Sequence, residues 1–308
     1  MANPNSSFDQ ISAITEKKFI PKMVDNIFAS IPLMKRLEKK MKKLDGGLTV
    51  VQPLNYAQAT AVGWYSGAET LDNTDNDTIS SAEFQWAQIY ASIAISRRDE
   101  LRNSGEAQKV DFVKSKVMIA EKSLKDTIAG DLYNAGTNAK AILGLRSFLS
   151  VSASYGGISQ TSQSWWQANI DSSTTTLTIS ALQSQWSNCA IEGEPPTLAL
   201  CTTANYDRYY ALLQPQQRFM DSESAEAGFT SLMFNGIPVI ADSKAPSGYF
   251  IFLNEDYLDL YVHKDENFRF EPFMKPINQN VRVAHIFAMM VLASSNNRMH
   301  AALTALTA

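Results

Sequence analysis

The chain has 308 residues, of which 45% are hydrophobic and 19% charged, a composition typical of a globular protein with a sizeable core. A formal net charge of -4 disfavours a protein whose main task is binding nucleic acid, because phosphate binding needs a basic surface. The first residues lack the charged region and the apolar region of a secretory signal. The longest apolar run, residues 286–293, is too short to span a bilayer. We therefore expect a cytosolic protein without membrane contact.

The first segment combines short helical turns with a basic run. Apolar residues recur at helical spacing from Ile20 to Phe28, and two prolines interrupt the pattern, which predicts an arm with helical turns rather than one long helix. The basic run from Lys35 to Lys43 either faces a polyanion or is the solvated face of an amphipathic helix; we favour the solvated helix face. The apolar residues that would seat this helix are Leu33, Met34, Leu37 and Met41.

A long β-hairpin is predicted after Gly46 and Gly47, where two extended runs are joined by the polar stretch DNTDNDTISS. A two-stranded ribbon has no interior of its own, so another surface must cover its aromatic residues. These residues are Trp64, Tyr65, Phe84, Trp86 and Tyr90.

The strongest helix pattern runs from residue 105 to residue 135, where apolar residues recur every three or four positions from Val110 to Leu132. Gly136 follows in the position of a helix-ending glycine. Beyond it, helical and strand-like segments alternate up to residue 262, and strand-like runs rich in aromatic and β-branched residues follow. The pattern predicts a mixed fold with a long single helix.

No motif for catalysis is present: neither common glycine-rich phosphate loop, nor HExxH, nor GxSxG occurs. His263, His285 and His300 are scattered through strand-like runs, which is typical of packed or solvated histidines. Cys189 and Cys201 fit neither a disulfide framework nor a zinc site, and Cys201 is expected in a buried strand. We expect no enzyme, no cofactor and no catalytic residue.

Two acidic clusters remain. A calcium loop counted from Asp72 would use Thr74, Asn76 and Glu83, but Asp77 stands where the loop needs glycine, so a polar hairpin tip is the better interpretation. The other cluster comprises Asp221, Glu223 and Glu226, has no partner base or nucleophile, and is interpreted as an acidic loop.

The order of these parts resembles the major capsid proteins of tailed bacteriophages, which have the Hong Kong 97-like fold. Two motifs carry the resemblance: TLALCTTANYDRYYALL, a strand followed by a helix, and FNGIPVIADSKAPSGYFIFLNEDYLDLYV. The longer motif is similar to the Gly-x-Pro-Val turn, Pro-Gly turn and following strand of that family. Gly236 and Pro238 are therefore interpreted as an architectural corner of a sheet rather than as part of a catalytic site.

The resemblance implies an α+β fold with an N-terminal arm, an extended β-hairpin loop, a long spine helix, and peripheral and axial domains. The arm would be residues 1–45 and the extended loop, which reaches over a neighbouring subunit, residues 46–84. Residues 85–146 with 266–292 would form the peripheral domain, with its spine helix at 105–135, and residues 147–265 with 293–308 the axial domain. The candidate inter-subunit residues on the hairpin are Trp64, Tyr65, Phe84 and Trp86.

The resemblance also implies a function: self-assembly through hexamers and pentamers into the icosahedral head of a virion, built in the host bacterial cytoplasm around double-stranded DNA that the protein contacts without reading. Expected partners are other copies of the chain, a portal, a decoration protein and a scaffolding protein; since no long acidic helical segment precedes the arm, the scaffolding protein is expected to be separate. An encapsulin-type nanocompartment shell and an α/β enzyme are the alternatives.

The extended loop departs from a branch of the family in which a lysine on this loop forms an isopeptide bond with a neighbouring subunit. No lysine occurs between Leu44 and Gln108, and Arg97 and Arg98 cannot lose a proton to replace it. We therefore expect a shell held together without covalent bonds.

Overall fold

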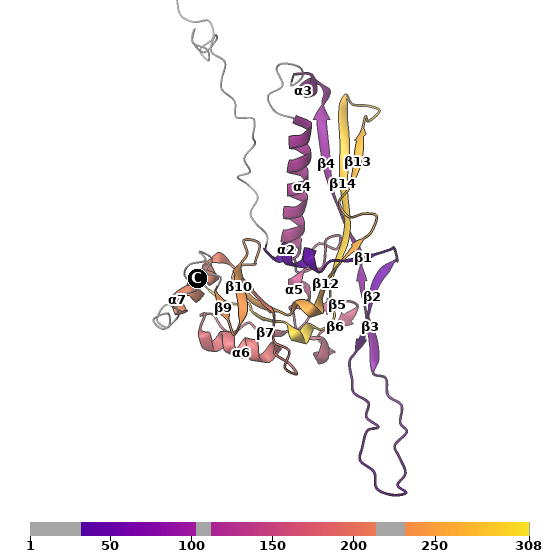
Figure 1. Ribbon diagram of the computed structural model, residues 1–308, viewed down its shortest axis with the longest axis vertical. Coiled ribbons are helices and arrows are strands. Elements are labelled where there is room, and N and C mark those ends of the chain that lie inside the picture. Colours follow the sequence, from indigo (N-terminus) through magenta and orange to yellow (C-terminus); the bar gives the residue numbers. More distant parts are fainter. Residues whose placement is uncertain (1–31, 103–111, 214–231, 308) are drawn as a thin grey trace, which may run out of the picture.

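Two sheets, each assembled from distant parts of the chain, organise an elongated molecule (Figure 1). The computed structural model describes residues 32–102, 112–213 and 232–307. In these ranges no helix is long and apolar enough to cross a membrane.

The five-stranded sheet is centred on β14 (Val281–Ser294). β4 (Ala87–Ser96) pairs with β14 over its whole length along one edge. β12 (Leu258–His263) and β13 (Arg269–Met274) pair antiparallel with β14, and their registers place them one after the other along its opposite edge. β1 (Lys42–Leu44) adds to β12 in parallel. The predicted domain boundary at residue 265 thus separates β12 from the strand with which it pairs; the division into domains stays a prediction.

The long helix α4 (Phe112–Asp131) lies beside β4 (Figure 1). It falls within the predicted span of 105–135, of which residues 105–111 lie outside the described part. The expected apolar stripe is buried only in the C-terminal half, at Leu124 and Ile128, whereas Val113 is exposed. α3 (Arg97–Arg102) continues β4 directly.

The six-stranded sheet has the order β7-β15-β11-β8-β10-β9. Its inner strands β8 (Leu198–Cys201) and β11 (Phe250–Leu253) are fully buried, as expected for Cys201. Because successive side chains of a strand point to opposite faces, Leu198 and Leu200 join one hydrophobic cluster and Ala199 and Cys201 another. The remaining strands are β7 (Asn169–Asp171), β9 (Met233–Phe234), β10 (Ile237–Ala241) and β15 (Ala301–Leu303).

Helices cover one face of this sheet. The predicted strand-then-helix motif is β8 followed by α7 (Thr203–Leu213), and Tyr209 of α7 joins the same cluster as Leu182 of α6 (Ile179–Cys189). Thr178 caps α6 by accepting a hydrogen bond from Ala181 N–H at 3.1 Å. The shorter elements are α5 (Leu145–Phe148), β5 (Ser154–Tyr155), β6 (Ile158–Ser159), η2 (Ser164–Trp166), η5 (Glu255–Tyr257) and η6 (Asn297–Met299).

The turn at Gly236 is a tight hairpin rather than the expected corner. Asn235 and Gly236 both have positive φ, 46° and 83°, and connect β9 to β10 as a two-residue turn of the kind that Asn-Gly favours. Pro238 lies within β10 opposite Met233. Gly236 and Pro238 thus belong to a hairpin at the edge of the six-stranded sheet.

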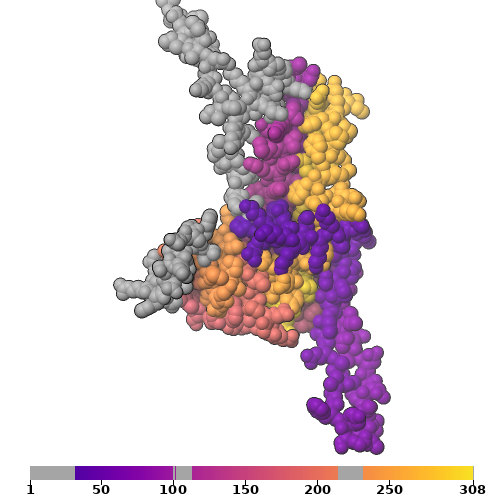
Figure 2. Space-filling model, viewed as in Figure 1, coloured from indigo at the N-terminus to yellow at the C-terminus, as the bar shows by residue number. Residues whose placement is uncertain are grey.

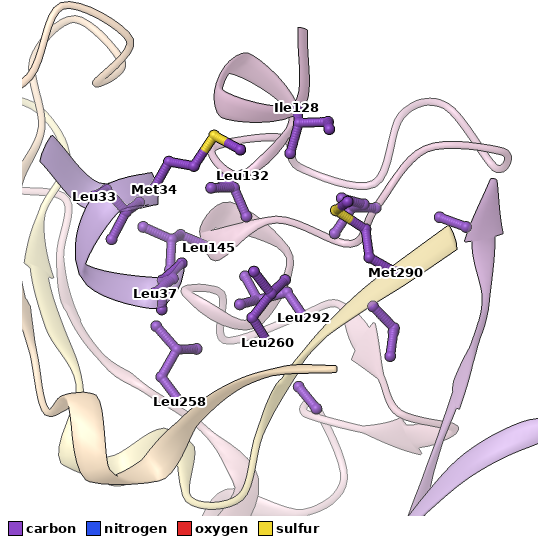
Figure 3. Packing of buried hydrophobic residues seen from close by; sticks show 14 of the residues in the cluster. Leu33, Met34, Leu37, Ile128, Leu132, Leu145, Leu258, Leu260, Met290 and Leu292 are labelled. Atoms are coloured by element: carbon purple, nitrogen blue, oxygen red, sulfur yellow. The ribbon is translucent and has the colours of Figure 1, made fainter. Parts of the chain in front are cut away.

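The larger hydrophobic cluster joins the two sheets, and helix α2 (Pro32–Lys39) covers one side of it. Leu33, Met34 and Leu37 are almost completely buried. They lie beside side chains of α5, of β12 and of the turn that directly follows α4 (Figure 3). The labelled partners are Leu132, Leu145, Leu258 and Leu260.

Candidate assembly surfaces

One serine–histidine contact could suggest catalysis, but its geometry argues against it. Ser294 Oγ lies 3.3 Å from His300 Nε2, and the backbone N–H of Asn254 donates to His300 Nδ1 at 3.3 Å. Since Nδ1 accepts, Nε2 carries the ring proton and cannot take a proton from the serine. Burial lowers the pKa of His300 to about 3 and keeps the ring neutral. The pair is a packed contact of the core.

The other candidate chemical groups are also structural. His285 stacks on Phe287 at 5.7 Å, and His263 packs against Trp86 at 6.0 Å. Burial raises the pKa of both Cys189 and Cys201 to about 12, so neither thiol ionises near neutral pH. In the described ranges no group of three or more potential metal ligands comes together.

The polar loop tip is consistent with a turn. Asp72 accepts hydrogen bonds from the hydroxyl and the backbone N–H of Thr74, at 2.6 and 2.9 Å. These bonds hold the pKa of the Asp72 carboxyl below its ordinary value. The carboxylate thus stabilises the turn in which Asp72 itself lies. The other acidic cluster, residues 221–226, lies outside the described residues.

The extended loop has a base that belongs to the body of its own chain. β2 (Thr49–Asn55) and β3 (Ile79–Gln85) pair antiparallel over seven residues. One face of this hairpin is buried, with the side chains of Val50, Leu54, Ala82 and Phe84. The backbone N–H of Glu83 donates to the carbonyl of Gly156 at 3.0 Å. The base is therefore anchored in the core rather than free to swing.

Gly156 makes this anchoring possible. A Cβ at this position would lie 2.8 Å from Ala82 Cβ and 3.1 Å from two ring atoms of Phe84, closer than a side chain tolerates. Its φ of +58° also favours glycine. The close approach lets the Phe84 ring pack on Tyr155, with ring centroids 5.0 Å apart. Elsewhere on the base, Tyr56 stacks on Trp165 at 5.3 Å.

Beyond Tyr56 the loop, residues 57–78, leaves the body of the molecule and projects from it (Figure 2). Apolar side chains here lie in the open: Val62 is 81% exposed, and Trp64 is fully exposed. Tyr65 and Leu71 are exposed as well. Several exposed large apolar side chains on one projection indicate a surface that another molecule covers.

The four hairpin residues proposed from the sequence thus fall into two pairs. Trp64 and Tyr65 are exposed on the loop, where a neighbouring subunit could reach them. Phe84 is completely buried within its own chain, which corrects its assignment, since it has no surface left for a neighbour. Trp86 is half-buried, and its Nε1–H donates to the carbonyl of Gly47 at 3.1 Å. Trp64 and Tyr65 remain the candidates.

Residues 32–45, which we call the docked segment, find partners for their charged side chains within their own chain. Arg36 makes a double hydrogen bond to Glu255, with Nε–Oε1 at 2.7 Å and Nη2–Oε2 at 2.5 Å. Lys40 pairs with Asp256 at 2.6 Å, and Lys42 with Asp259 at 2.7 Å. The expectation of one solvated helix face from Lys35 to Lys43 is therefore only partly correct: α2 ends at Lys39, Lys42 and Lys43 lie in β1, and Arg36, Lys40 and Lys42 pair with carboxylates of η5 and β12.

The Arg36–Glu255 pair is the most enclosed of these contacts. Burial disfavours the ionised form of Glu255, but the hydrogen bonds and charge of Arg36, with help from Thr197 and Lys40, outweigh burial and lower the pKa of Glu255 below its ordinary value. Thr197 also accepts a hydrogen bond from the backbone N–H of Glu255 at 3.0 Å. Sequence reasoning missed this pair and Gly156, because both contacts join segments far apart in the chain; the adjacent glycines 156 and 157 were the only local signal.

The comparisons with known proteins agree on the architecture. The sequence matches no family model and no curated protein. The structure is similar to the capsid asymmetric unit of cyanophage A-1(L), with a TM-score of 0.75 at 18% identity, covering 96% of this chain and 98% of that chain.

Two further structures cover nearly all of both chains. The capsid of the native GTA particle gives a TM-score of 0.72 at 12% identity, covering 99% of this chain and 100% of that chain. The holo-SrpI encapsulin complex of Synechococcus elongatus gives 0.63 at 11% identity, covering 99% and 96%. At such identities the likeness establishes the fold. The chain therefore has the Hong Kong 97-like α+β fold of shell-forming capsid proteins, and the resemblance inferred from its sequence is confirmed at that level.

Proposed function

We propose that this chain is the major capsid protein of a tailed bacteriophage, which assembles through hexamers and pentamers into the icosahedral shell around the double-stranded DNA genome. The observation that carries the proposal is the extended loop, which is anchored at its base yet bare at its apolar tip. Such a loop has no partner among the described residues of its own chain and gains one in a closed shell, where many weak contacts act together.

The proposed role is structural rather than catalytic. Buried thiols, a serine–histidine contact in the wrong tautomer and the capsid-type fold all favour this view. A portal, a decoration protein and a separate scaffolding protein are the further proposed partners, and contact with packaged DNA would be non-specific.

Sedimentation and negative-stain electron microscopy of the purified full chain test self-assembly. We expect rings, sheets or shells that form above a threshold concentration. A protein that stays monomeric up to high concentration, alone or with the other head proteins, would contradict the proposal. Uniform closed shells from the chain alone would support it but would count against a separate scaffolding protein.

An encapsulin-type shell is the alternative candidate, because the encapsulin structure covers nearly the whole chain with a TM-score of 0.63. The content of particles isolated from their natural source distinguishes the two. Double-stranded DNA that survives nuclease treatment until the particles are opened supports a virus capsid. A protein cargo without DNA supports a nanocompartment.

A further inference from the structure

The chain contains a single Asn-Gly dipeptide, Asn235–Gly236, and the structure places it in an open turn. An asparagine loses the ammonia of its side chain most readily when glycine follows, because glycine has no side chain that hinders attack by its own backbone nitrogen. Both residues are exposed, and a Cβ on Gly236 would meet nothing within 4 Å. Water therefore reaches both reacting groups.

The reacting nitrogen is not needed to hold the hairpin together. Asn235 and Gly236 connect β9 to β10, with Ile237 opposite Phe234. In a two-residue turn the N–H of the fourth residue, here Ile237, closes the turn on the carbonyl of the first, here Phe234. The N–H of Gly236 can therefore lose its proton without any loss of strand pairing.

The backbone of the turn opposes the reaction. Asn235 and Gly236 have φ values of 46° and 83°, the left-handed combination of a type I′ turn. In this conformation the Cβ of Asn235 and the nitrogen of Gly236 lie on opposite sides of the bond between Cα and the carbonyl carbon. The side-chain carbon Cγ cannot reach the nitrogen until the turn opens.

The turn lies where opening costs little. β9 has two residues and is the edge strand of its sheet. Its second pair is Met233–Pro238, and Pro238 has no N–H to donate. The hydroxyl of Tyr209 donates to the carbonyl of Met233 at 2.8 Å, so the strand stays attached and opening is confined to the turn. Local opening of this kind delays the reaction rather than preventing it.

Gln183 of α6 adds a second restraint. The Nδ2–H of Asn235 donates to Gln183 Oε1 at 2.8 Å. Nδ2 is the atom that leaves as ammonia, and while it is held on α6 the side-chain amide cannot turn toward Gly236. A single exposed hydrogen bond is weak, so this restraint slows the reaction by a small factor only.

We propose that Asn235 is a self-modification site, at which the chain deamidates slowly at a rate set by opening of the turn and by the bond to Gln183. The nitrogen of Gly236 loses its proton to hydroxide and attacks Cγ of Asn235. The Cγ–Nδ2 bond breaks, ammonia leaves, and a five-membered succinimide forms. Water then opens this ring at either carbonyl, which gives aspartate or isoaspartate. Water is the co-reactant, and nothing is oxidised or reduced.

The modification changes both charge and backbone. Each event adds one negative charge to a chain whose formal net charge is -4. Isoaspartate also routes the main chain through the side-chain carbon, which lengthens a two-residue turn and strains the pairing of Phe234, a buried residue of the smaller hydrophobic cluster. The reaction belongs to the single chain and does not depend on the proposed function.

Incubation of the full chain in heavy-oxygen water at mildly alkaline pH tests the site. Mass spectrometry measures the labelled aspartate and isoaspartate at position 235, and a synthetic peptide of residues 231–240 gives the rate without the fold. We expect the folded chain to react about ten-fold more slowly than the peptide, because the turn must open first.

Two results of this comparison overturn the proposal. One is a folded chain that reacts as fast as the peptide, since the turn then sets no rate. The other is a folded chain without labelled product after a period in which a reaction about a hundred-fold slower than that of the peptide would be complete.

Substitutions on α6 test the second restraint. Gln183→Ala removes the acceptor and should raise the rate about two- to three-fold. Gln183→Glu keeps an accepting oxygen and should react no faster than wild type. Ser187→Ala is the matched control, because it removes only the other hydrogen bond of Gln183, from Nε2 to Ser187 Oγ at 3.3 Å. Gln183 and Ser187 are both exposed, so none of these changes disturbs the core. Equal rates for Gln183→Ala and Ser187→Ala overturn the role of Gln183.

Asn235→Gly separates this reaction from other changes with age. Glycine adopts the left-handed turn without strain and has no side-chain amide. Isoelectric focusing of aged wild-type protein should show a species with one additional negative charge, and aged Asn235→Gly should lack it. The same acidic species in both proteins overturns Asn235 as its source.

Discussion

The docked segment and the extended loop are both peripheral, but the apolar residues of the docked segment are buried by their own chain and those of the loop are exposed. The docked segment buries Leu33, Met34 and Leu37 in its own core and pairs its cations with Glu255, Asp256 and Asp259. The loop holds Val62, Trp64 and Tyr65 away from its own chain. The two regions teach that a projecting segment alone does not identify an assembly element; the deciding feature is whether its apolar side chains are covered by the chain itself.

Removing the tip of the loop should have the largest effect and should separate assembly from the stability of the single chain. Replacing residues 59–76 with a short Gly-Ser linker keeps β2 and β3 intact and removes the exposed apolar side chains. We expect assembly to be abolished and thermal unfolding to be unchanged, because the segment contributes nothing to its own core. Electron microscopy and calorimetry measure the two effects. Loss of the unfolding transition would show that the loop is part of the intramolecular core.

A pair of single substitutions sharpens the same contrast. Leu37→Ala removes a buried side chain of the docked segment and should lower the free energy of unfolding by about 2–5 kcal/mol. Trp64→Ala removes a larger side chain but should change the free energy of unfolding of the monomer by about 0.5 kcal/mol or less, while weakening assembly. Chemical denaturation of unassembled protein measures both. Equal destabilisation by the two substitutions would contradict the distinction.

Gly156 holds the base of the extended loop against the body of the chain. Gly156→Ala should destabilise the protein by about 2–4 kcal/mol, since its Cβ collides with Ala82 and its φ is left-handed. Gly157→Ala is the matched control, because Gly157 also has positive φ but open space around its Cβ, and should cost only about 1 kcal/mol. Equal losses in denaturant titrations would mean that the close approach is unimportant.

The ion pairs of the docked segment should have a smaller effect. Glu255→Gln should cost about 1–2 kcal/mol, less than a fully buried pair, because Arg36 is one-third exposed. Asp256→Asn, at the exposed Lys40 pair, should cost about 0.5 kcal/mol or less.

The Arg36–Glu255 pair should also give a pH dependence. Since the folded state lowers the pKa of Glu255, its contribution is present above the ordinary carboxyl pKa and is lost as pH falls through the lowered value. Glu255→Gln should flatten the loss of stability in this acidic window, measured by urea titrations from pH 6 downward. A variant with the wild-type acid profile would show that the pair is not the cause.

The last prediction is that denaturation of the particles reveals no covalent oligomers. Since the loop carries no lysine, boiling mature particles in detergent should release a single species near 34.1 kDa on a denaturing gel. A ladder that survives boiling and reduction would reveal a covalent link and would overturn the expectation of a shell held together without covalent bonds.

Local patterns in the sequence were sufficient for several elements. Repeated apolar spacing identified the long helix, and the short buried strand at Cys201 was readable from its run of apolar residues. Local patterns could not show what covers a hairpin. The alternation of Val50, Leu54, Ala82 and Phe84 indicated one buried face, but the residues that bury it, Tyr155 and Gly156, lie more than seventy positions further along the chain.

Non-local pairing explains the other differences. The carboxylates opposite Arg36, Lys40 and Lys42 lie more than two hundred residues away, so the basic run showed neither its partners nor that its second half leaves the helix for β1. For the same reason β12 could not be assigned to its sheet: a strand's own residues do not reveal the strand with which it pairs.

The position of β14 has a consequence for how the chain is made. β4 can complete its pairing only when residues 281–290 have been synthesised, and β7 and β11 of the other sheet wait for β15 at residues 301–303. Neither sheet can therefore close before segments far apart in the chain have met, and contacts this distant in sequence make folding slow.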